Sequence, residues 1–176
     1  MTIETKENSE RAKLLFKNLL LDTFINSYHF GTQFTIEFAR DEGKYFESKK
    51  LPHTLDLAIH TNWTIGPPKS WEYYIDNMND FFKKDFFIKD EPLLAFWLTV
   101  YRWSDNSSVS DVVFSDKNVI IHFKNGHLIT LPYTTESGDL SWLLIESKDI
   151  LSINAPPDWG VKCDSLGNLS YQFVPL

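Results

Sequence analysis

The chain has 176 residues, of which 24 are acidic and 17 are basic, so its formal net charge is −7; it also holds 14 Phe, 7 Tyr and 6 Trp. This length predicts a single domain over residues 1–176 that buries roughly two thirds of its unfolded surface. The acidic balance argues against direct binding to nucleic acid, because such proteins displace counterions with clustered Lys and Arg. It favours a basic protein partner instead.

Residues 9–22 are predicted to form an amphipathic helix. Apolar side chains recur there at helical spacing behind Asn8 or Ser9 as the N-cap, and they are Leu14, Leu15, Phe16 and Leu19. Such a stripe is expected to pack on a sheet.

Two segments alternate between apolar and polar residues with a period of two, as strands of a half-buried sheet do. Residues 28–40 form the first predicted strand, with Glu37 on its polar face. Residues 55–65 show the cleanest alternation in the chain, with Trp63 on the apolar face, and they predict an antiparallel sheet with one hydrated face. A polar loop at 41–50 separates the two.

A second helix is predicted over about residues 70–84, with Ser70 as its N-cap after the strand-ending Gly66-Pro67-Pro68. Residues 92–103 fit either a helix or a strand by their apolar spacing, and their content of Thr, Val, Tyr and Trp favours a strand.

The remaining residues are predicted to form an antiparallel meander. Its strands are expected at 109–114, 119–124, 127–132, 141–146, 149–153 and 169–173. Asn125-Gly126 supplies both left-handed residues of a type I′ turn, so Lys124 is expected to pair with His127. On that register one face carries Val119, Ile121, Phe123, Leu128 and Thr130. The fold class is therefore α+β: a mostly antiparallel, twisted β-sheet with the N-terminal helix and a second helix (about 70–84) packed on it.

No catalytic, metal or cofactor motif emerges from the pattern. His122 and His127 project from one face of the predicted hairpin, but a zinc site needs three or four convergent ligands, and neither a Cys pair nor a carboxylate stands nearby. The single cysteine, Cys163, lies in a turn-like stretch and has no second cysteine to pair with, and no serine stands in a nucleophile elbow. We therefore expect no cofactor, no metal and no enzymatic activity.

The aromatic residues of 92–103 support two interpretations. As a strand, this segment would be substantially apolar on both faces, which suits either a central strand covered by helices or an aromatic-lined groove that accepts a partner. In the groove hypothesis the partner-binding residues are Trp63, Trp97, Tyr101, Trp103, Asp105 and Asp111, and Glu37 on the polar face of its strand is a further candidate. Their carboxylates would steer a basic partner and raise its association rate.

Several segments together carry a family resemblance. They are Gly31-Thr32-Gln33-Phe34 leading into Ile36-Glu37-Phe38, the alternating 55–63 strand, Leu98-Thr99-Val100-Tyr101-Arg102-Trp103, the strand at 112–114, and Ile121-His122-Phe123-Lys124-Asn125-Gly126-His127-Leu128. With a strand that ends in an aromatic-rich Arg-Trp, a short acidic turn and a Phe-x-Asn-Gly hairpin, the chain resembles the immunity proteins of bacterial contact-dependent growth inhibition and polymorphic toxin systems.

This resemblance covers most of the chain and implies a function. Such a protein binds the C-terminal toxin domain of its own strain's effector, often a nuclease with a basic surface, and inhibits it stoichiometrically. The resemblance transfers no binding residue, because these families diversify at the contacting positions. The start of the chain, residues 1–10, is charged rather than apolar, and no apolar run approaches the roughly 20 residues that cross a bilayer, so we expect a cytoplasmic protein that does not enter a membrane.

Two other functional classes stay open. A carbohydrate- or peptide-binding module would also use exposed Trp and Tyr side chains. A small hydrolase would need a set of His and carboxylate groups that only folding could bring together, such as His60, Asp56 and His122.

Overall fold

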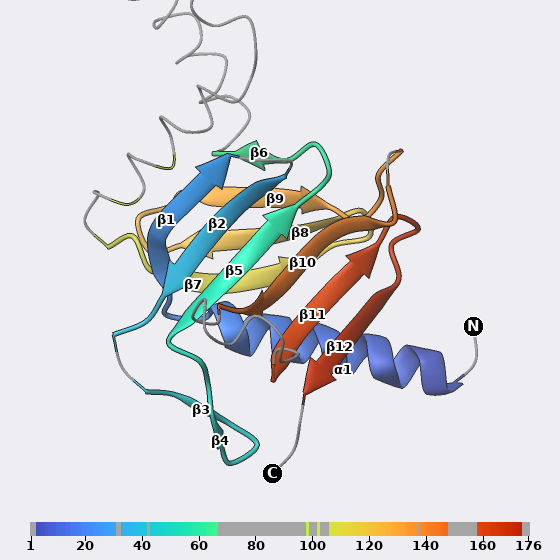
Figure 1. Ribbon diagram of the computed structural model, residues 1–176, viewed down its shortest axis with the longest axis horizontal. Helices are drawn as coiled ribbons and strands as arrows, with labels where there is room; N and C mark the ends of the chain where they lie inside the picture. Colours follow the sequence, from blue (N-terminus) through green and yellow to red (C-terminus); the bar gives the residue numbers. More distant parts are fainter. Residues whose placement is uncertain are drawn as a thin grey trace, which may run out of the picture.

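The computed structural model describes residues 3–30, 33–41, 43–66, 98, 102, 106–136, 138–147 and 158–173. One helix and three antiparallel sheets make up this part of the chain (Figure 1). The largest sheet has six strands in the order β1-β2-β5-β10-β11-β12, the second has four in the order β6-β9-β8-β7, and β3 and β4 form a short ribbon.

The helix α1 spans Ile3–Leu20. The six-stranded sheet consists of β1 (Phe24–Phe30), β2 (Phe34–Ala39), β5 (Thr54–Ile59), β10 (Leu140–Glu146), β11 (Trp159–Asp164) and β12 (Leu169–Phe173). The four-stranded sheet consists of β6 (Thr64–Ile65), β7 (Val109–Phe114), β8 (Asn118–Phe123) and β9 (Leu128–Pro132), and the ribbon of β3 (Tyr45–Phe46) and β4 (Lys49–Lys50).

The helix and the four-stranded sheet cover the same face of the six-stranded sheet (Figure 1). All three layers contribute buried side chains to one hydrophobic core. Phe16 of α1 joins them, because its ring centroid lies 4.8 Å from that of Trp142 on β10 and 5.9 Å from that of Phe114 on β7. The opposite face of the six-stranded sheet therefore points away from the core. In the part of the chain that the structure describes, no helix combines the length and the apolar character that a membrane crossing requires.

The predicted α+β class, with a mostly antiparallel sheet and an N-terminal helix, is confirmed. The helix begins at Ile3, however, so the caps proposed at Asn8 and Ser9 are wrong, because both residues lie inside it. The predicted second helix over 70–84 and the predicted strand over 149–153 lie outside the described residues, which give neither of them support.

Two predicted strands are each divided in the structure. Residues 28–40 belong to the β1–β2 hairpin, in which Phe30 pairs directly with Phe34. A loop of three residues keeps the period of two intact, so the alternation alone cannot distinguish this hairpin from one continuous strand. Residues 55–65 likewise supply β5 and β6, which belong to different sheets that face the same core.

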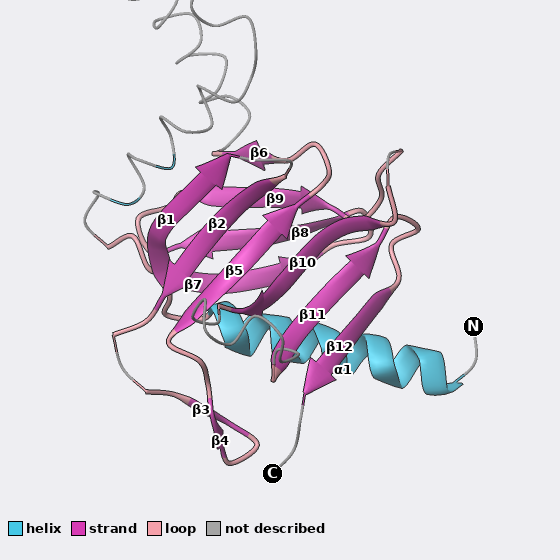
Figure 2. Ribbon diagram, in the orientation of Figure 1, coloured by secondary structure: helices cyan, strands magenta, loops and turns pink. Residues whose placement is uncertain are grey.

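The range 92–103 is described at Leu98 and Arg102 alone. The backbone is helical at both positions, where the strand prediction is therefore wrong (Figure 2). Leu98 is buried and Arg102 is exposed. The other residues of this range lie outside the description.

The β8–β9 hairpin forms at Asn125-Gly126, but with a register one residue away from the predicted one. Gly126 is left-handed at φ +85° and Asn125 is not, which excludes a type I′ turn. Gly126 N–H donates to the Phe123 carbonyl at 3.0 Å, and His122 pairs with Leu128. The three-residue loop with a glycine bulge brings Ile129 and Leu131 into the core and turns Leu128 and Thr130 outward.

Strands predicted at 109–114, 141–146 and 169–173 are confirmed to within one residue. The β3–β4 ribbon forms within the stretch predicted as a polar loop. The prediction also missed β11, so that Cys163 lies in a buried strand rather than in a turn.

Candidate functional site

The outward face of the six-stranded sheet carries two carboxylates side by side. Glu37 on β2 and Asp56 on β5 are direct cross-strand partners. Their chain neighbours Ile36, Phe38 and Leu55 are fully buried on the other face, so the two carboxylates point away from the core. Side chains at directly opposed positions of an antiparallel pair are close neighbours, with Cβ atoms about 5 Å apart.

The surroundings of this pair are polar. The Asn26 amide donates to the Glu37 carboxylate, and Ser27 on β1 lies opposite Glu37 in the strand register. Both carboxylates are half-buried. Within the described ranges, neither of them forms an ion pair with Lys or Arg.

Burial raises the pKa of Asp56, and the negative charge of Glu37 adds to the increase, while the Ser147 hydroxyl and His29 act in the opposite direction. Two like charges directly opposed across strands are destabilising. The folded chain therefore keeps a pair of carboxylates that would be more stable with a cation beside them.

The other predicted partner-binding residues do not join Glu37. Trp63 lies in the core at 8% exposure, with its ring centroid 4.8 Å from that of Phe34. Asp111 lies on β7 of the other sheet, on the opposite side of the core. Trp97, Tyr101, Trp103 and Asp105 lie outside the described residues, so the predicted groove has no structural description.

Asp111 has structural partners of its own. Its carboxylate lies 2.5 Å from Lys17 Nζ on α1 and accepts the N–H of Val112 at 2.8 Å. The pKa of Asp111 is lowered, mainly by its hydrogen bond with Lys17 and secondly by that with the Val112 N–H. The side chain thus ties the edge strand β7 to the helix.

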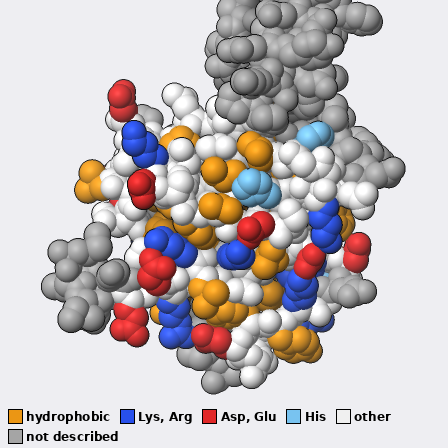
Figure 3. Space-filling model, turned by 180° about the vertical axis from the view of Figure 1, so that it is seen from behind, with side chains coloured by type: hydrophobic (Ala, Val, Ile, Leu, Met, Phe, Trp, Pro, Cys, Tyr) orange, Lys and Arg blue, Asp and Glu red, His pale blue; other side chains and the backbone are white. Residues whose placement is uncertain are grey.

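The rear of the molecule shows the same pairing of charges. Figure 3 shows acidic and basic side chains interspersed over this face rather than gathered by sign. Among the described residues, the ion pairs of the molecule include Arg11 with Glu47 at 2.8 Å. Half-burial without an ion pair among the described residues therefore distinguishes the Glu37–Asp56 pair from the paired carboxylates of Glu10, Asp22, Glu47 and Asp111.

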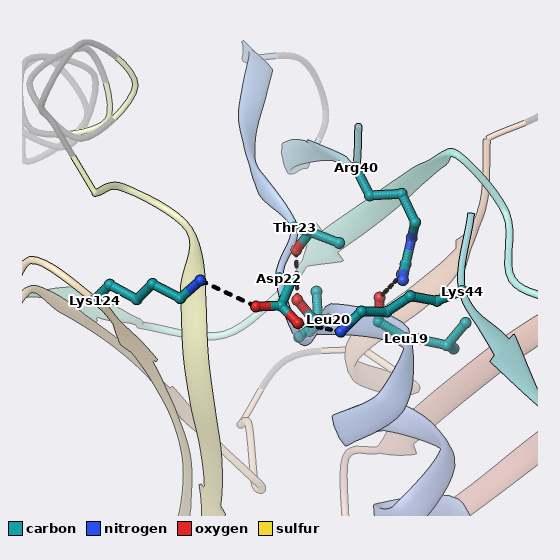
Figure 4. A network of polar contacts seen from close by, with 7 residues as sticks. All are labelled: Leu19, Leu20, Asp22, Thr23, Arg40, Lys44 and Lys124. Carbon is teal, nitrogen blue, oxygen red and sulfur yellow. Dashed lines mark hydrogen bonds and ion pairs between the residues drawn. The ribbon is translucent and has the colours of Figure 1, made fainter. Parts of the chain in front are cut away.

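A second polar cluster closes the C-terminal end of α1 (Figure 4). The backbone of Asp22 is left-handed, at φ 60°. Its carboxylate forms ion pairs with Lys44 and Lys124, which together lower the pKa of Asp22. The buried Arg40 guanidinium donates to the Leu19 carbonyl, and Thr23 Oγ1 donates to the Leu20 carbonyl at 2.6 Å. These contacts join the helix end to both sheets and to the 41–53 excursion, which is the segment between β2 and β5. The cluster is therefore a structural junction.

The hydrolase hypothesis required His60, Asp56 and His122 to converge. Asp56 and His122 instead lie on the outward faces of different sheets, with the core between them. Cys163 is fully buried, and burial raises the pKa of its thiol to about 12, with Asp164 adding to the increase. No group of three or more His, Cys, Asp or Glu side chains in the described segments is placed to hold a metal ion.

The sequence identified Glu37 as a site residue from its place on a polar strand face. It placed Asp56 on a hydrated face too, but it assigned that residue to a catalytic set. Only the β2–β5 register, which pairs strands separated by the 41–53 excursion, shows that the two carboxylates are neighbours.

Comparison with known proteins found no match among protein-family models, curated proteins or solved structures.

Proposed function

We propose that this chain is an immunity protein that binds a cognate toxin domain with a basic surface, such as a nuclease, and neutralises it in the cytoplasm by stoichiometric association. The observation that carries the proposal is the half-buried Glu37–Asp56 pair, which has no cationic partner among the described residues. The family resemblance and the net charge of −7 support the same reading.

The chemistry of the pair suits a Lys or Arg side chain of the partner. A cation placed between two carboxylates removes their mutual repulsion and forms charge-assisted hydrogen bonds, each worth about 1.5–3 kcal/mol. An arginine can bind a carboxylate through two parallel N–H groups, which adds orientation to attraction. Such contacts contribute to the specificity and to the association rate of a complex.

The direct test is co-expression of the chain with the toxin domain encoded immediately upstream of its gene, with growth and co-purification as the two measurements. Rescue of growth together with a stable one-to-one complex is the expected result. A folded chain that neither rescues growth nor co-purifies would overturn the proposal.

Matched variants locate the contact within the complex. Glu37→Gln and Asp56→Asn keep the shape of the side chains and remove their charge, and each is expected to weaken the complex at least tenfold. Asp158→Asn removes one exposed charge at the start of β11 and is expected to leave affinity within about twofold. Equal affinity in all three variants would remove the carboxylate pair from the interface and leave the immunity function standing.

A further inference from the structure

Three loops meet at one end of the six-stranded sheet and are bonded to one another. They are residues 60–63 before β6, the described residues 133–136 and 138–139 before β10, and residues 165–168 between β11 and β12. Thr61 Oγ1 donates to the Thr134 carbonyl at 3.3 Å, and Ser165 N–H donates to the Asp139 carbonyl at 3.2 Å. We call this set of loops the loop end.

The tip of the loop end is a rigid turn centred on Asp164. One oxygen of its carboxylate accepts the N–H of Leu166 at 3.0 Å and that of Asn168 at 2.8 Å, and the other accepts the Asn168 side-chain amide at 2.8 Å. Gly167 supplies a left-handed residue at φ +88°, and its N–H donates to the Asp164 carbonyl. A β-bridge between Leu166 and Thr134 fixes the turn to the neighbouring loop.

Leu166 stands at this tip with 80% of its surface exposed, and it is the most exposed of the large apolar residues that the structure describes. A single exposed leucine on a flexible loop needs no explanation. This leucine differs because it stands in a turn held by four hydrogen bonds to Asp164, of which one comes from the Leu166 N–H, and by the bridge to Thr134, so a partner that covers it meets little additional cost of ordering.

The charge of the loop end is negative in balance. Its segments contain no Lys or Arg, and Glu136 and Asp139 are exposed on the loop that contacts the Leu166 turn. The adjoining turn, in which the Lys117 carbonyl accepts the Tyr133 N–H at 3.0 Å, adds the exposed Asp116 and Lys117, which cancel each other. An apolar anchor with a polar rim is the usual anatomy of a protein interface. The negative rim selects a partner whose apolar pocket is surrounded by Lys or Arg.

We infer that the loop end is a docking surface for a basic protein partner, with Leu166 as the anchor that enters an apolar pocket and with Glu136 and Asp139 facing basic residues at the rim of that pocket. The inference rests on the proposed function for the identity of the partner, which is the toxin domain. The loop end would be a second contact region beside the Glu37–Asp56 pair, and the surface of the partner that it fits would be an apolar pocket with a basic rim.

The test measures the affinity of the purified toxin domain encoded upstream for Leu166→Ser and for a matched control, Leu14→Ser. Leu14 is also an exposed leucine, at 52%, but it lies on α1. Leu166→Ser is expected to weaken binding at least tenfold, because a leucine buried in an interface loses its contacts. The affinity of the control is expected to stay within about twofold. In urea unfolding Leu166→Ser should match the wild type, and Leu14→Ser should be slightly less stable, because serine is a poorer helix former than leucine.

Charge reversal tests the rim separately. Asp139→Lys and Glu136→Lys are expected to slow association and to reduce its dependence on salt, whereas Asp158→Lys, at the opposite end of β11, is expected to leave the association rate unchanged. If the wild type binds and protects but Leu166→Ser does so equally well, the docking inference fails and the immunity function stands. If the wild type neither binds nor protects, both proposals fall.

Discussion

At the scale of single residues, the folded environment changes what each group can do. The thiol of Cys163 donates to the Tyr133 carbonyl at 3.2 Å and is fully buried, so its raised pKa leaves it as a packing group rather than a nucleophile. Burial likewise raises the pKa of the Asp56 carboxyl group, which lies beside the Glu37 carboxylate on the outward face of the sheet.

The first prediction concerns the stability of the free protein at Asp56. Because its pKa is raised in the folded state, ionisation costs stability as the pH rises through the folded pKa, and that cost is absent below the unfolded pKa. Asp56→Asn removes the cost, so at pH 7 the variant is expected to be more stable than the wild type by about 0.5 kcal/mol, a typical value for opposed like charges.

Urea unfolding at pH 7 and at pH 3 measures this difference. The gain in stability of Asp56→Asn over the wild type should be present at pH 7. It should shrink at pH 3, where the wild-type Asp56 carboxyl group is protonated. A variant that is less stable at pH 7 would show that Asp56 stabilises the fold, and it would remove the argument that the pair is kept for binding. Residues retained at a cost in stability are typical of functional surfaces.

At the scale of elements, the sequence predicted which residues are buried better than it predicted where strands end. Alternation in 28–40 and 55–65 was read correctly as strand structure, but a loop of odd length or a passage between two sheets on one core preserves that alternation. The helical backbone at Leu98 and at Arg102 shows the complementary difficulty, since the β propensity on which the strand prediction rested depends strongly on context.

Turn chemistry explains the register error. Asn125-Gly126 is the preferred sequence for a type I′ turn, yet it forms a three-residue loop in which Gly126 alone is left-handed. The two consecutive left-handed residues are Glu47 at φ 46° and Ser48 at φ 68°, in the β3–β4 ribbon. Neither is a residue that type I′ turns prefer, so the ribbon keeps a strained turn that no local signal predicts.

The second prediction follows from that strain. Ser48→Gly relieves a left-handed conformation that costs an L-residue about 1–2 kcal/mol. Part of this gain is offset, because glycine loses more conformational entropy on folding than serine does. The variant is expected to stabilise the protein by about 0.5 kcal/mol in urea unfolding. The converse change, Gly126→Ala, should destabilise it by about 1 kcal/mol through backbone strain alone, because a Cβ at Gly126 meets no atom within 4 Å. A loss of stability in Ser48→Gly would contradict the strain at this turn.

At the scale of the whole molecule, two sheets and a helix are held together by contacts between segments distant in sequence. Phe16 joins α1 to both sheets, and the Asp22 junction joins the helix end to Lys44 and Lys124. The sequence predicted Leu15, Phe16 and Leu19 of the apolar stripe of the helix correctly, whereas Leu14, placed on the same stripe, is 52% exposed. It could not predict which side chains meet at the junction, since Asp22 and Lys124 are 102 residues apart.

The third prediction tests that junction. The pKa of Asp22 is lowered in the folded state by Lys44 and Lys124, so its contribution to stability is present above the unfolded pKa and is lost as the pH falls through the folded pKa. Asp22→Asn keeps a side chain that tolerates the left-handed backbone and removes the charge. Because both ion pairs are exposed, the variant is expected to lose about 0.5–1 kcal/mol at pH 7 and low salt.

Three comparisons separate the junction from a general effect of charge. The deficit of Asp22→Asn should shrink in 1 M salt, which screens exposed pairs, and it should also shrink as the pH falls through the lowered folded pKa of Asp22. Glu10→Gln removes one exposed ion pair, with Lys13 at 2.7 Å within α1, and it is expected to lose less than Asp22→Asn. An equal loss in both variants would mean that Asp22 acts as an ordinary surface ion pair. A larger loss for Asp22 that follows pH and salt would show that the two sheets and the helix depend on this one carboxylate for part of their cohesion.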